Sequence, residues 1–197
     1  MENRSEYSIE YFSTDISVEE YIANFRDEAR FIEMCRQCPN HGNSWGCPPF
    51  NFDTESYMRQ YRHVHLMATK ITPRHPDMFA GSIQEFIRPE RIRIEKRLLE
   101  MEKKYGGRAF AYIGSCLHCK GAECMRKFKK PCLHPDKVRP SLEAFGFDIS
   151  RTLTELFDIQ LIWGKNGGLP EYLVLVCALF HNSDSLGSIP PKTPLLL

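Results

Sequence analysis

Seven of the eight cysteines fall into two short groups, and their spacing constrains this chain more than any other feature. The first group has the pattern C-x2-C-x8-C-P, and the second has the pattern C-x2-C-x4-C-x7-C. Two cysteines separated by two residues can turn both sulfurs toward one centre, so each group predicts a metal-binding loop. The first group is Cys35, Cys38 and Cys47, and the second is Cys116, Cys119, Cys124 and Cys132.

The second group contains enough cysteines to supply all four ligands of a metal centre. Four thiolates suit either a tetrahedral zinc ion or a [4Fe–4S] cluster. A zinc ribbon usually brings two C-x2-C pairs together, whereas only one such pair is present here, and this uneven wrapping favours a cluster. Five basic residues and one acidic residue lie between positions 116 and 132. They would offset an anionic site of either kind, so the charge does not separate iron–sulfur from zinc.

The first group has three cysteines and needs a fourth ligand to close a site. His41 is the nearest candidate, Cys177 is a second, and water or a substrate is a third. An open position would allow chemistry at the metal, whereas completion by His41 would make the site structural. Cys177 lies in the apolar run Leu173–Phe180, which predicts a buried, inert core cysteine instead of a ligand.

Length and charge narrow the class of protein. The chain has 197 residues, which predicts one domain, and its 26 basic and 25 acidic residues do not suggest a nucleic-acid binder. Met1–Glu10 lacks the apolar core of a secretory signal, and the longest apolar run, Tyr172–Phe180, is shorter than the roughly 20 residues of a membrane helix. We therefore expect a cytoplasmic protein with no membrane association. In this reducing compartment, clustered cysteines are more often metal ligands or redox groups than disulfides.

Periodicity predicts an α+β fold. Strands are expected over Glu6–Ser13, Val64–Ile71 and Ala109–Gly114, with Ile159–Trp163 and Tyr172–Phe180 paired as a hairpin around Lys165–Gly168. Helices are expected over Val18–Met34, Asp53–Tyr61, Ile83–Tyr105 and Ile149–Phe157. The predicted architecture is a single layered domain over residues 1–182, a mixed or antiparallel sheet with helices on one face and two Cys-rich metal-binding loops. Residues 183–197 are expected to be a proline-containing tail.

Motifs outside the two cysteine groups give no further indication of a functional site. His63 and His65 alternate along a predicted strand and so share a face, where a polar strand face is expected in preference to a metal or acid/base pair. The sequence has no G-x-G-x-x-G, no P-loop and no G-x-S-x-G, so it offers no dinucleotide site and no nucleophile elbow.

The motifs, taken in order, resemble a known family. These are C-x2-C-P-N-x-G-x-x-W-x-C-P-P, then C-x2-C-x4-C and P-C, and then the segment Arg139–Asp148. They resemble the prokaryotic family called predicted metal-binding protein, domain of unknown function 2284, over roughly Ala29–Phe180. The resemblance implies metal binding through Cys35, Cys38 and Cys47 and through Cys116, Cys119, Cys124 and Cys132. It names no reaction.

The sequence predicts an iron–sulfur protein with one or two [4Fe–4S] clusters. It would transfer electrons or sense redox state for a partner enzyme, and no nucleic-acid partner is expected. Two alternatives remain open: a zinc-stabilised interaction module, and an enzyme with an open metal site at Cys35, Cys38 and Cys47. The oligomeric state is open as well.

Overall fold

The computed structural model describes residues 6–75, 82–111, 114, 116–119, 121–164 and 168–184. Within these residues the strands are β1 (Tyr7–Ser17), β2 (His63–Pro73), β3 (Arg108–Phe110) and β4 (Leu173–His181). The helices are α1 (Val18–Phe25), α2 (Glu28–Arg36), α3 (Thr54–Met58), α4 (Ile83–Tyr105) and α5 (Ile149–Phe157). The short 3₁₀ helices η2 (Met125–Phe128) and η3 (Glu143–Phe145) lie in the segment between β3 and α5.

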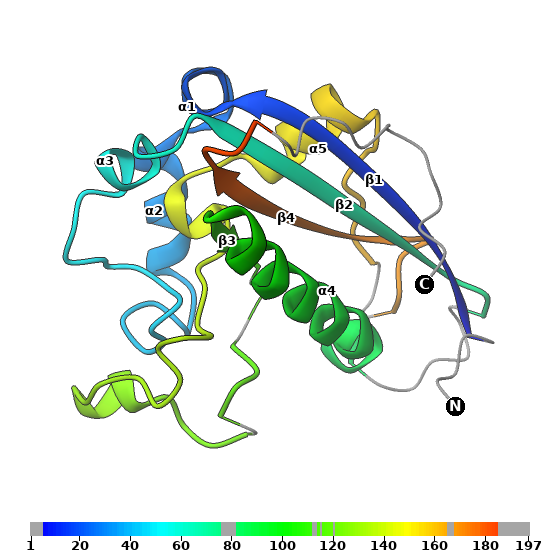
Figure 1. The fold of residues 1–197 in the computed structure, drawn as a ribbon. Helices are drawn as coiled ribbons and strands as arrows, with labels where there is room; N and C mark the ends of the chain where they lie inside the picture. Colours follow the sequence, from blue (N-terminus) through cyan, green and yellow to red (C-terminus); the bar gives the residue numbers. More distant parts are fainter. Residues whose placement is uncertain are drawn as a thin grey trace.

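The four strands form one antiparallel sheet in the order β1-β2-β4-β3 (Figure 1). The long strands β1 and β2 pair along their whole length, from Tyr7 opposite Pro73 to Ser17 opposite His63. The central strands β2 and β4 are joined over His63–Ile71, and the short β3 closes the far edge. This arrangement confirms the predicted α+β class with an antiparallel sheet.

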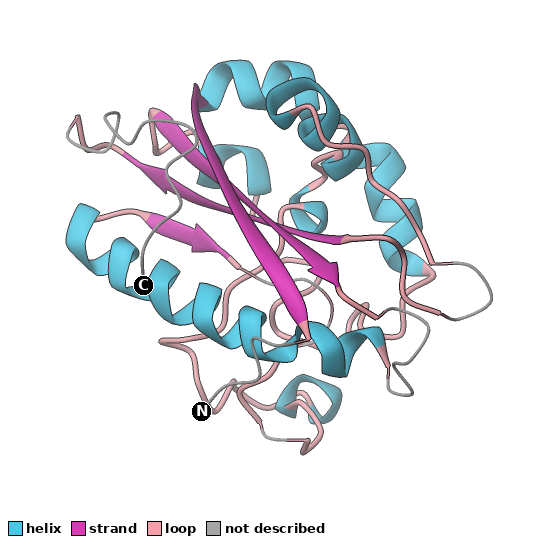
Figure 2. Ribbon diagram, turned by 90° about the vertical axis from the view of Figure 1, so that its right-hand side faces the viewer, coloured by secondary structure: helices cyan, strands magenta, loops and turns pink. Residues whose placement is uncertain are grey.

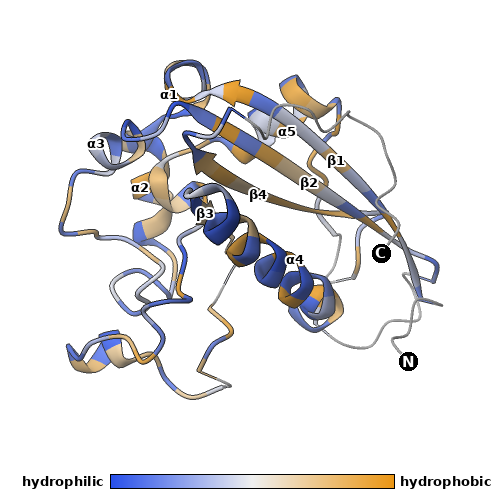
Figure 3. Ribbon diagram, viewed as in Figure 1, coloured by the Kyte–Doolittle hydropathy of each residue, from blue (hydrophilic) through white to orange (hydrophobic). Residues whose placement is uncertain are grey.

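Helices cover both faces of the sheet (Figure 2). On one face, Leu66 and Ala178 pack against α1, α3, α5 and η3. On the other face, Ile71 and Cys177 pack against α4. Side chains alternate between faces along a strand, and β2 and β4 are apolar on both. Figure 3 shows this for β4, which is hydrophobic along most of its length. The expectation of helices on one face is therefore wrong for α4.

The longest helix begins and ends as predicted. The hydroxyl of Ser82 accepts a hydrogen bond from the N–H of Glu85, whose carboxylate accepts one from the N–H of Ser82, which forms a capping box. Gly106 ends α4 in the left-handed conformation, with φ of 64°. No helix in the described part of the chain is both long and apolar enough to span a bilayer.

The predicted helix over Val18–Met34 is two helices. α1 ends at Phe25, and Arg26 forms an isolated antiparallel bridge with Phe147. Asp27 then caps α2, because its carboxylate accepts a hydrogen bond from the N–H of Arg30 at 3.1 Å. The single-helix prediction is wrong because this bridge to a distant segment interrupts an otherwise continuous helical pattern.

The predicted C-terminal hairpin is also wrong. Ile159–Trp163 forms no strand, and β4 pairs with β2 and β3 instead. The other predicted elements are present, but some of their bounds differ. β1 continues beyond the predicted end at Ser13 to Ser17, α3 covers only Thr54–Met58 of the predicted helix, and β3 ends at Phe110 instead of Gly114. Residues 165–167 of the predicted turn, residues 112 and 113 of the third predicted strand, and residues 185–197 of the predicted tail lie outside the described residues.

Gly146 holds α2 in its place, and its substitution gives a first prediction. Its φ is 87°, its carbonyl accepts a hydrogen bond from the N–H of Asp27 at 2.8 Å, and an added Cβ would lie 2.7 Å from the Cα of Glu28. We expect G146A to lower the free energy of unfolding by about 2 kcal/mol, because alanine is strained at positive φ and would displace backbone. Urea denaturation measures the loss.

Gly106 provides the matched control for that substitution. Its φ is also positive, but an added Cβ would meet nothing within 4 Å. The G106A variant should therefore lose only about 1 kcal/mol, the strain of the left-handed backbone alone. Equal losses in the two variants would contradict the packing of α2 described here.

Candidate metal centre

The first cysteine group lies where α2 ends and a compact loop begins. Cys35 is in the last turn of α2, and its carbonyl accepts a hydrogen bond from the N–H of Cys38 at 3.0 Å. The loop then turns back on itself, so that the N–H of Gly42 donates to the carbonyl of Pro48 at 2.8 Å, beside Cys47. The helix end and this loop bring the three cysteines into one region.

The three thiols of the first group are within electrostatic reach of one another. Burial raises the pKa of Cys35, and the neighbouring Cys38 raises it further. Burial also raises the pKa of Cys47 to about 11, where Cys38 and Cys35 add to the rise and a hydrogen bond with Ser44 and the charge of Arg126 oppose it. The thiolate forms of these cysteines repel one another. A bound metal would relieve this repulsion, because its positive charge takes the place of the thiol protons.

The second cysteine group lies in a long loop whose described part contains only the short helix η2 before η3. Cys116 and Cys119 enter the loop, Cys124 directly precedes η2, and Cys132 follows it. All four thiols are half-buried. Burial raises the pKa of Cys119, and the nearby Cys124 and Cys132 raise it further. The backbone N–H of His134 donates to the Sγ of Cys132 at 3.3 Å, a bond that would also stabilise a thiolate.

Arg126 fastens the two loops together. From η2 its guanidinium donates to three backbone carbonyls of the first loop, those of Ser44, Cys47 and Pro49. It also lies over the ring of Trp45, with 5.3 Å from the guanidinium carbon to the ring centroid. The indole N–H of Trp45 donates in return to the carbonyl of Lys130 at 3.1 Å. The two cysteine groups therefore lie side by side below the sheet (Figure 1).

The donor set fits a thiolate-bound metal in its chemistry. None of the described cysteines forms a disulfide, and soft sulfur ligands suit zinc and iron–sulfur clusters. Among the described residues, no three His, Cys, Asp or Glu side chains already converge closely enough to hold a metal ion. The sulfurs of each group would thus have to close around a metal as it binds.

Side chains of α4 tie the second loop to the body of the protein. The Nε2 of His118 lies 3.1 Å from the Oε1 of Glu95, and the rings of His118 and His134 have centroids 5.9 Å apart. Farther along, the guanidinium of Arg139 donates to both carboxylate oxygens of Glu102, at 2.7 and 2.5 Å. The loop that carries four cysteines is therefore held at two points along α4.

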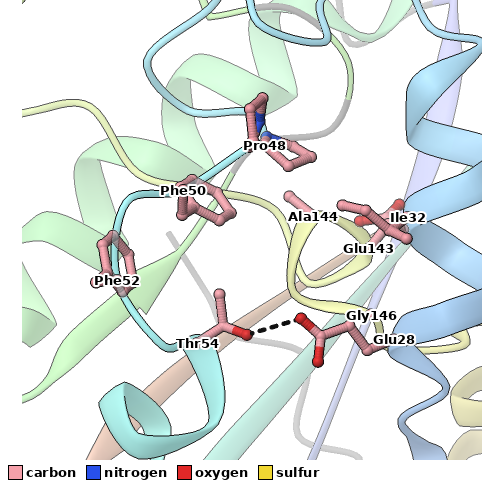
Figure 4. A pocket seen from close by; sticks show the side chains of 10 residues that line it. Glu28, Ile32, Pro48, Phe50, Phe52, Thr54, Glu143, Ala144 and Gly146 are labelled. Atoms are coloured by element: carbon pink, nitrogen blue, oxygen red, sulfur yellow. Dashed lines mark hydrogen bonds between the residues drawn. The ribbon is translucent and has the colours of Figure 1, made fainter.

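A half-buried acid, Glu143, lies beside the first group. Burial raises the pKa of Glu143, and its carboxyl is close enough to Cys35 to raise the pKa of that thiol as well. Glu143 lines a cavity of about 160 Å³ (Figure 4), between Ala144 on its own side and Pro48 and Phe50 from the first cysteine loop. The cavity places a carboxyl group next to the cysteine loop.

Sequence reasoning misses two acidic residues that support the cysteine loops. Glu95 lies on the buried face of α4, and its place between the apolar Ile94 and Leu98 was the signal available. Glu143 lies inside the segment Arg139–Asp148 that carries part of the family resemblance, but nothing in its local sequence indicates that it faces Cys35. The contact of each residue with a cysteine loop depends on the packing of segments that are distant in the sequence.

His41 and Cys177, the two candidate fourth ligands, differ in their surroundings. His41 is half-buried, and its backbone N–H donates to the carbonyl of Cys38 at 3.0 Å, so it lies within the first loop. Its role as a ligand remains a prediction. Cys177 is 1% exposed on the α4 face of the sheet, and burial raises its pKa to about 12. This confirms that Cys177 is a core residue.

His63 and His65 share a face of β2, as predicted, and two further side chains join them. His65 lies opposite Asp15 on β1, with its Nδ1 2.9 Å from a carboxylate oxygen. His63 lies opposite His181 on β4, with ring centroids 5.5 Å apart. His181 is 2% exposed, its Nδ1–H donates to the carbonyl of Ser183 at 3.1 Å, and its Nε2 is buried without a hydrogen-bond partner.

The buried His181 gives a second prediction, on pH. Burial lowers its pKa below the ordinary value of 6.5, and His63 and His65 lower it further while Asp15 opposes them. Below about pH 6.5 the unfolded chain therefore takes up a proton that the folded chain does not, so stability should fall as pH drops through this value toward the folded pKa. We expect H181N to lose less stability than the natural chain between about pH 7.5 and about pH 5.5 in urea denaturation.

His75, which is exposed, serves as the control for the pH experiment. The H75N variant should lose as much stability on acidification as the natural chain does. Identical losses in H181N and the natural chain would show that His181 does not carry the effect.

Comparison with known proteins identifies a family. A family model described as predicted metal-binding protein (DUF2284) matches residues 21–177, a span that includes both cysteine groups and every element from α2 to α5. Searches of curated proteins and of solved structures gave no match. The match confirms the resemblance drawn from the sequence motifs.

Proposed function

Because the chain belongs to the family of predicted metal-binding proteins, we propose that its two cysteine groups hold iron–sulfur centres and that it transfers electrons or senses redox state for a partner protein. The observation that carries the proposal is the fastening of two thiol-rich loops by Arg126 and Trp45. Two redox centres held close together could pass electrons from one to the other. A [4Fe–4S] cluster supplies reversible one-electron transfer when bound.

The protein's own residues would supply ligands and compensate charge. Cys116, Cys119, Cys124 and Cys132 form a complete set of four thiolates, and Cys35, Cys38 and Cys47 would be joined by His41. The N–H of His134 donates to a ligand sulfur, and such bonds tune the reduction potential of a cluster. The basic residues of the second loop would offset the negative charge of thiolate-bound centres; they include Arg126, Lys127, Lys129 and Lys130.

Reduction by dithionite tests the redox proposal. In anaerobically purified protein we expect a visible absorption that bleaches on reduction, and an electron paramagnetic resonance signal that appears with it. Reoxidation should restore the starting spectrum. A metal centre that dithionite cannot reduce would contradict a role in electron transfer.

A zinc-stabilised interaction module is the second candidate. The observation in its favour is the small amount of regular structure in the described part of the second loop, where a structural metal would contribute folding free energy directly. On this account the protein is colourless and a chelator lowers its melting temperature. A chelator-treated sample with an unchanged melting curve would rule it out.

A further inference from the structure

A cleft of about 510 Å³ opens between the two cysteine loops, and the iron–sulfur proposal makes no use of it. One wall comes from the first loop, another from the segment that contains η2 and Pro140, and β3 and η3 contribute Arg108 and Phe145. This volume lies in the range of ordinary small-molecule sites, roughly 300 to 1,000 Å³. The cleft is therefore large enough for a compact organic ligand.

Aromatic rings form much of the cleft wall. Trp45 and Phe52 are 39% and 45% exposed, so part of each ring is in contact with water. The ring of Phe52 lies 5.3 Å from that of Phe50 and 5.2 Å from that of Tyr57, so the rings form a continuous wall. A flat ring on a ligand could stack here and cover apolar surface that is now in water.

The charge of the cleft is positive. Among the described residues, Arg108, Arg126 and Lys129 line it, and no acidic side chain does. The guanidinium of Arg126 donates to backbone carbonyls, and in the part of the chain that the structure describes it forms no ion pair with a carboxylate. Lys129 is exposed at the rim. A ligand that enters the cleft therefore meets three cations.

The positive charge of Arg108 is only partly balanced by a neighbouring acid. Its nearest acid is Glu102, at 3.6 Å, but that carboxylate already accepts two hydrogen bonds from Arg139 and one from the N–H of Ala109. Two guanidinium groups thus share one carboxylate. The Nε of Arg108 is buried without a hydrogen-bond partner, and buried donors of this kind are costly unless a ligand satisfies them.

We propose that this cleft binds a small organic molecule that carries both a flat ring and an anionic group, with the ring against the aromatic wall and the anion at Arg108. A carboxylate and a phosphate would satisfy the guanidinium equally well, since both accept two parallel hydrogen bonds. The ligand would lie between the two cysteine groups. Binding does not depend on which metal these groups hold.

Calorimetric titration of the protein as purified, with its metal, tests the proposal. The two probes are adenosine 5′-monophosphate, a ring with a phosphate, and 4-hydroxybenzoate, a ring with a carboxylate. Adenosine and inorganic phosphate supply the ring alone and the anion alone. We expect at least one probe to bind one to one and at least about tenfold more tightly than either control, because both parts of the ligand contribute. The preferred probe tells a phosphate from a carboxylate ligand.

Variants locate the binding. R108Q should weaken it about tenfold or more, the effect of one lost charge-assisted hydrogen bond. R108K should weaken it less than R108Q, because lysine keeps the positive charge but cannot donate two parallel hydrogen bonds. R88Q, which replaces an exposed arginine on α4, should leave binding unchanged. In a W163F background Trp45 is the remaining tryptophan, so a change in its fluorescence on titration places the ligand in the cleft. Melting curves check that each variant is folded.

Three results would overturn the proposal. They are no saturable binding of either probe at millimolar concentration, binding of adenosine or phosphate alone as tight as that of the probes, and equal affinity in folded R108Q and R88Q. Each of these is independent of the iron–sulfur proposal, which dithionite reduction tests separately.

Discussion

Replacing Cys119 with alanine will remove the metal of the second group and leave that of the first. Cys119 lies within electrostatic reach of Cys124 and Cys132, so its loss leaves a four-thiolate shell incomplete at its centre. C38A should have the reverse effect, because Cys38 is the thiol that raises the pKa of both Cys35 and Cys47. Iron, zinc and sulfide per chain measure the loss in each variant.

Cys177 supplies the control for both variants. It is a free cysteine like the others, but it is buried in the core and packs on the α4 face of the sheet. The C177A variant should keep its full metal content while losing about 1 kcal/mol of stability through the small cavity that it leaves. If C119A or C38A retained all its metal, the assignment of its group would be wrong. If either variant alone lost all metal, the two groups would build one centre.

Replacing Arg139 with methionine should cost about 3 kcal/mol of unfolding free energy. Arg139 is 4% exposed, and besides its two bonds to Glu102 it donates to the carbonyls of Val138 and Asp136. Its removal takes two hydrogen bonds from the carboxylate of Glu102 and one from each of the two carbonyls, in a buried site. The end of the second cysteine loop also loses its anchor on α4. Urea denaturation measures the change in stability.

An exposed pair of the same chemistry is the control for Arg139. Arg59 and Glu55 form an ion pair at 2.9 Å, with both side chains more than 40% exposed. Because solvent screens such a pair, R59M should change the stability by less than about 1 kcal/mol. A loss in R139M no larger than that in R59M would show that Arg139 does not anchor the loop.

The local elements of the fold are predictable from the sequence because their signals are local. The bounds of α4 follow from Ser82 and Gly106, and the start of α1 follows from Ser17, whose hydroxyl caps it. The break between α1 and α2 and the partners of β4 are not predictable in this way. Both depend on contacts with distant segments, such as the bridge from Arg26 to Phe147.

In the candidate site, too, local features are predictable from the sequence and contacts between distant segments are not. Spacing alone predicts two metal-binding groups that contain seven cysteines, and metal binding by these residues stays a prediction, because no three potential ligands among the described residues converge closely enough to hold an ion. The connection between the groups rests on Arg126 and Trp45, whose contacts cross from one loop to the other. The roles of Glu95 and Glu143 depend on how α4 and η3 pack against the loops, and a single sequence does not give that packing.

The most direct test of the metal assignment is the content of iron, zinc and acid-labile sulfide per chain in anaerobically purified protein, measured with its visible spectrum. The account predicts a brown protein. Each chain should contain about four iron and four sulfide ions if it holds one [4Fe–4S] cluster, and about eight of each if it holds two. Colourless protein with one or two zinc ions and no sulfide would contradict it and favour the interaction module.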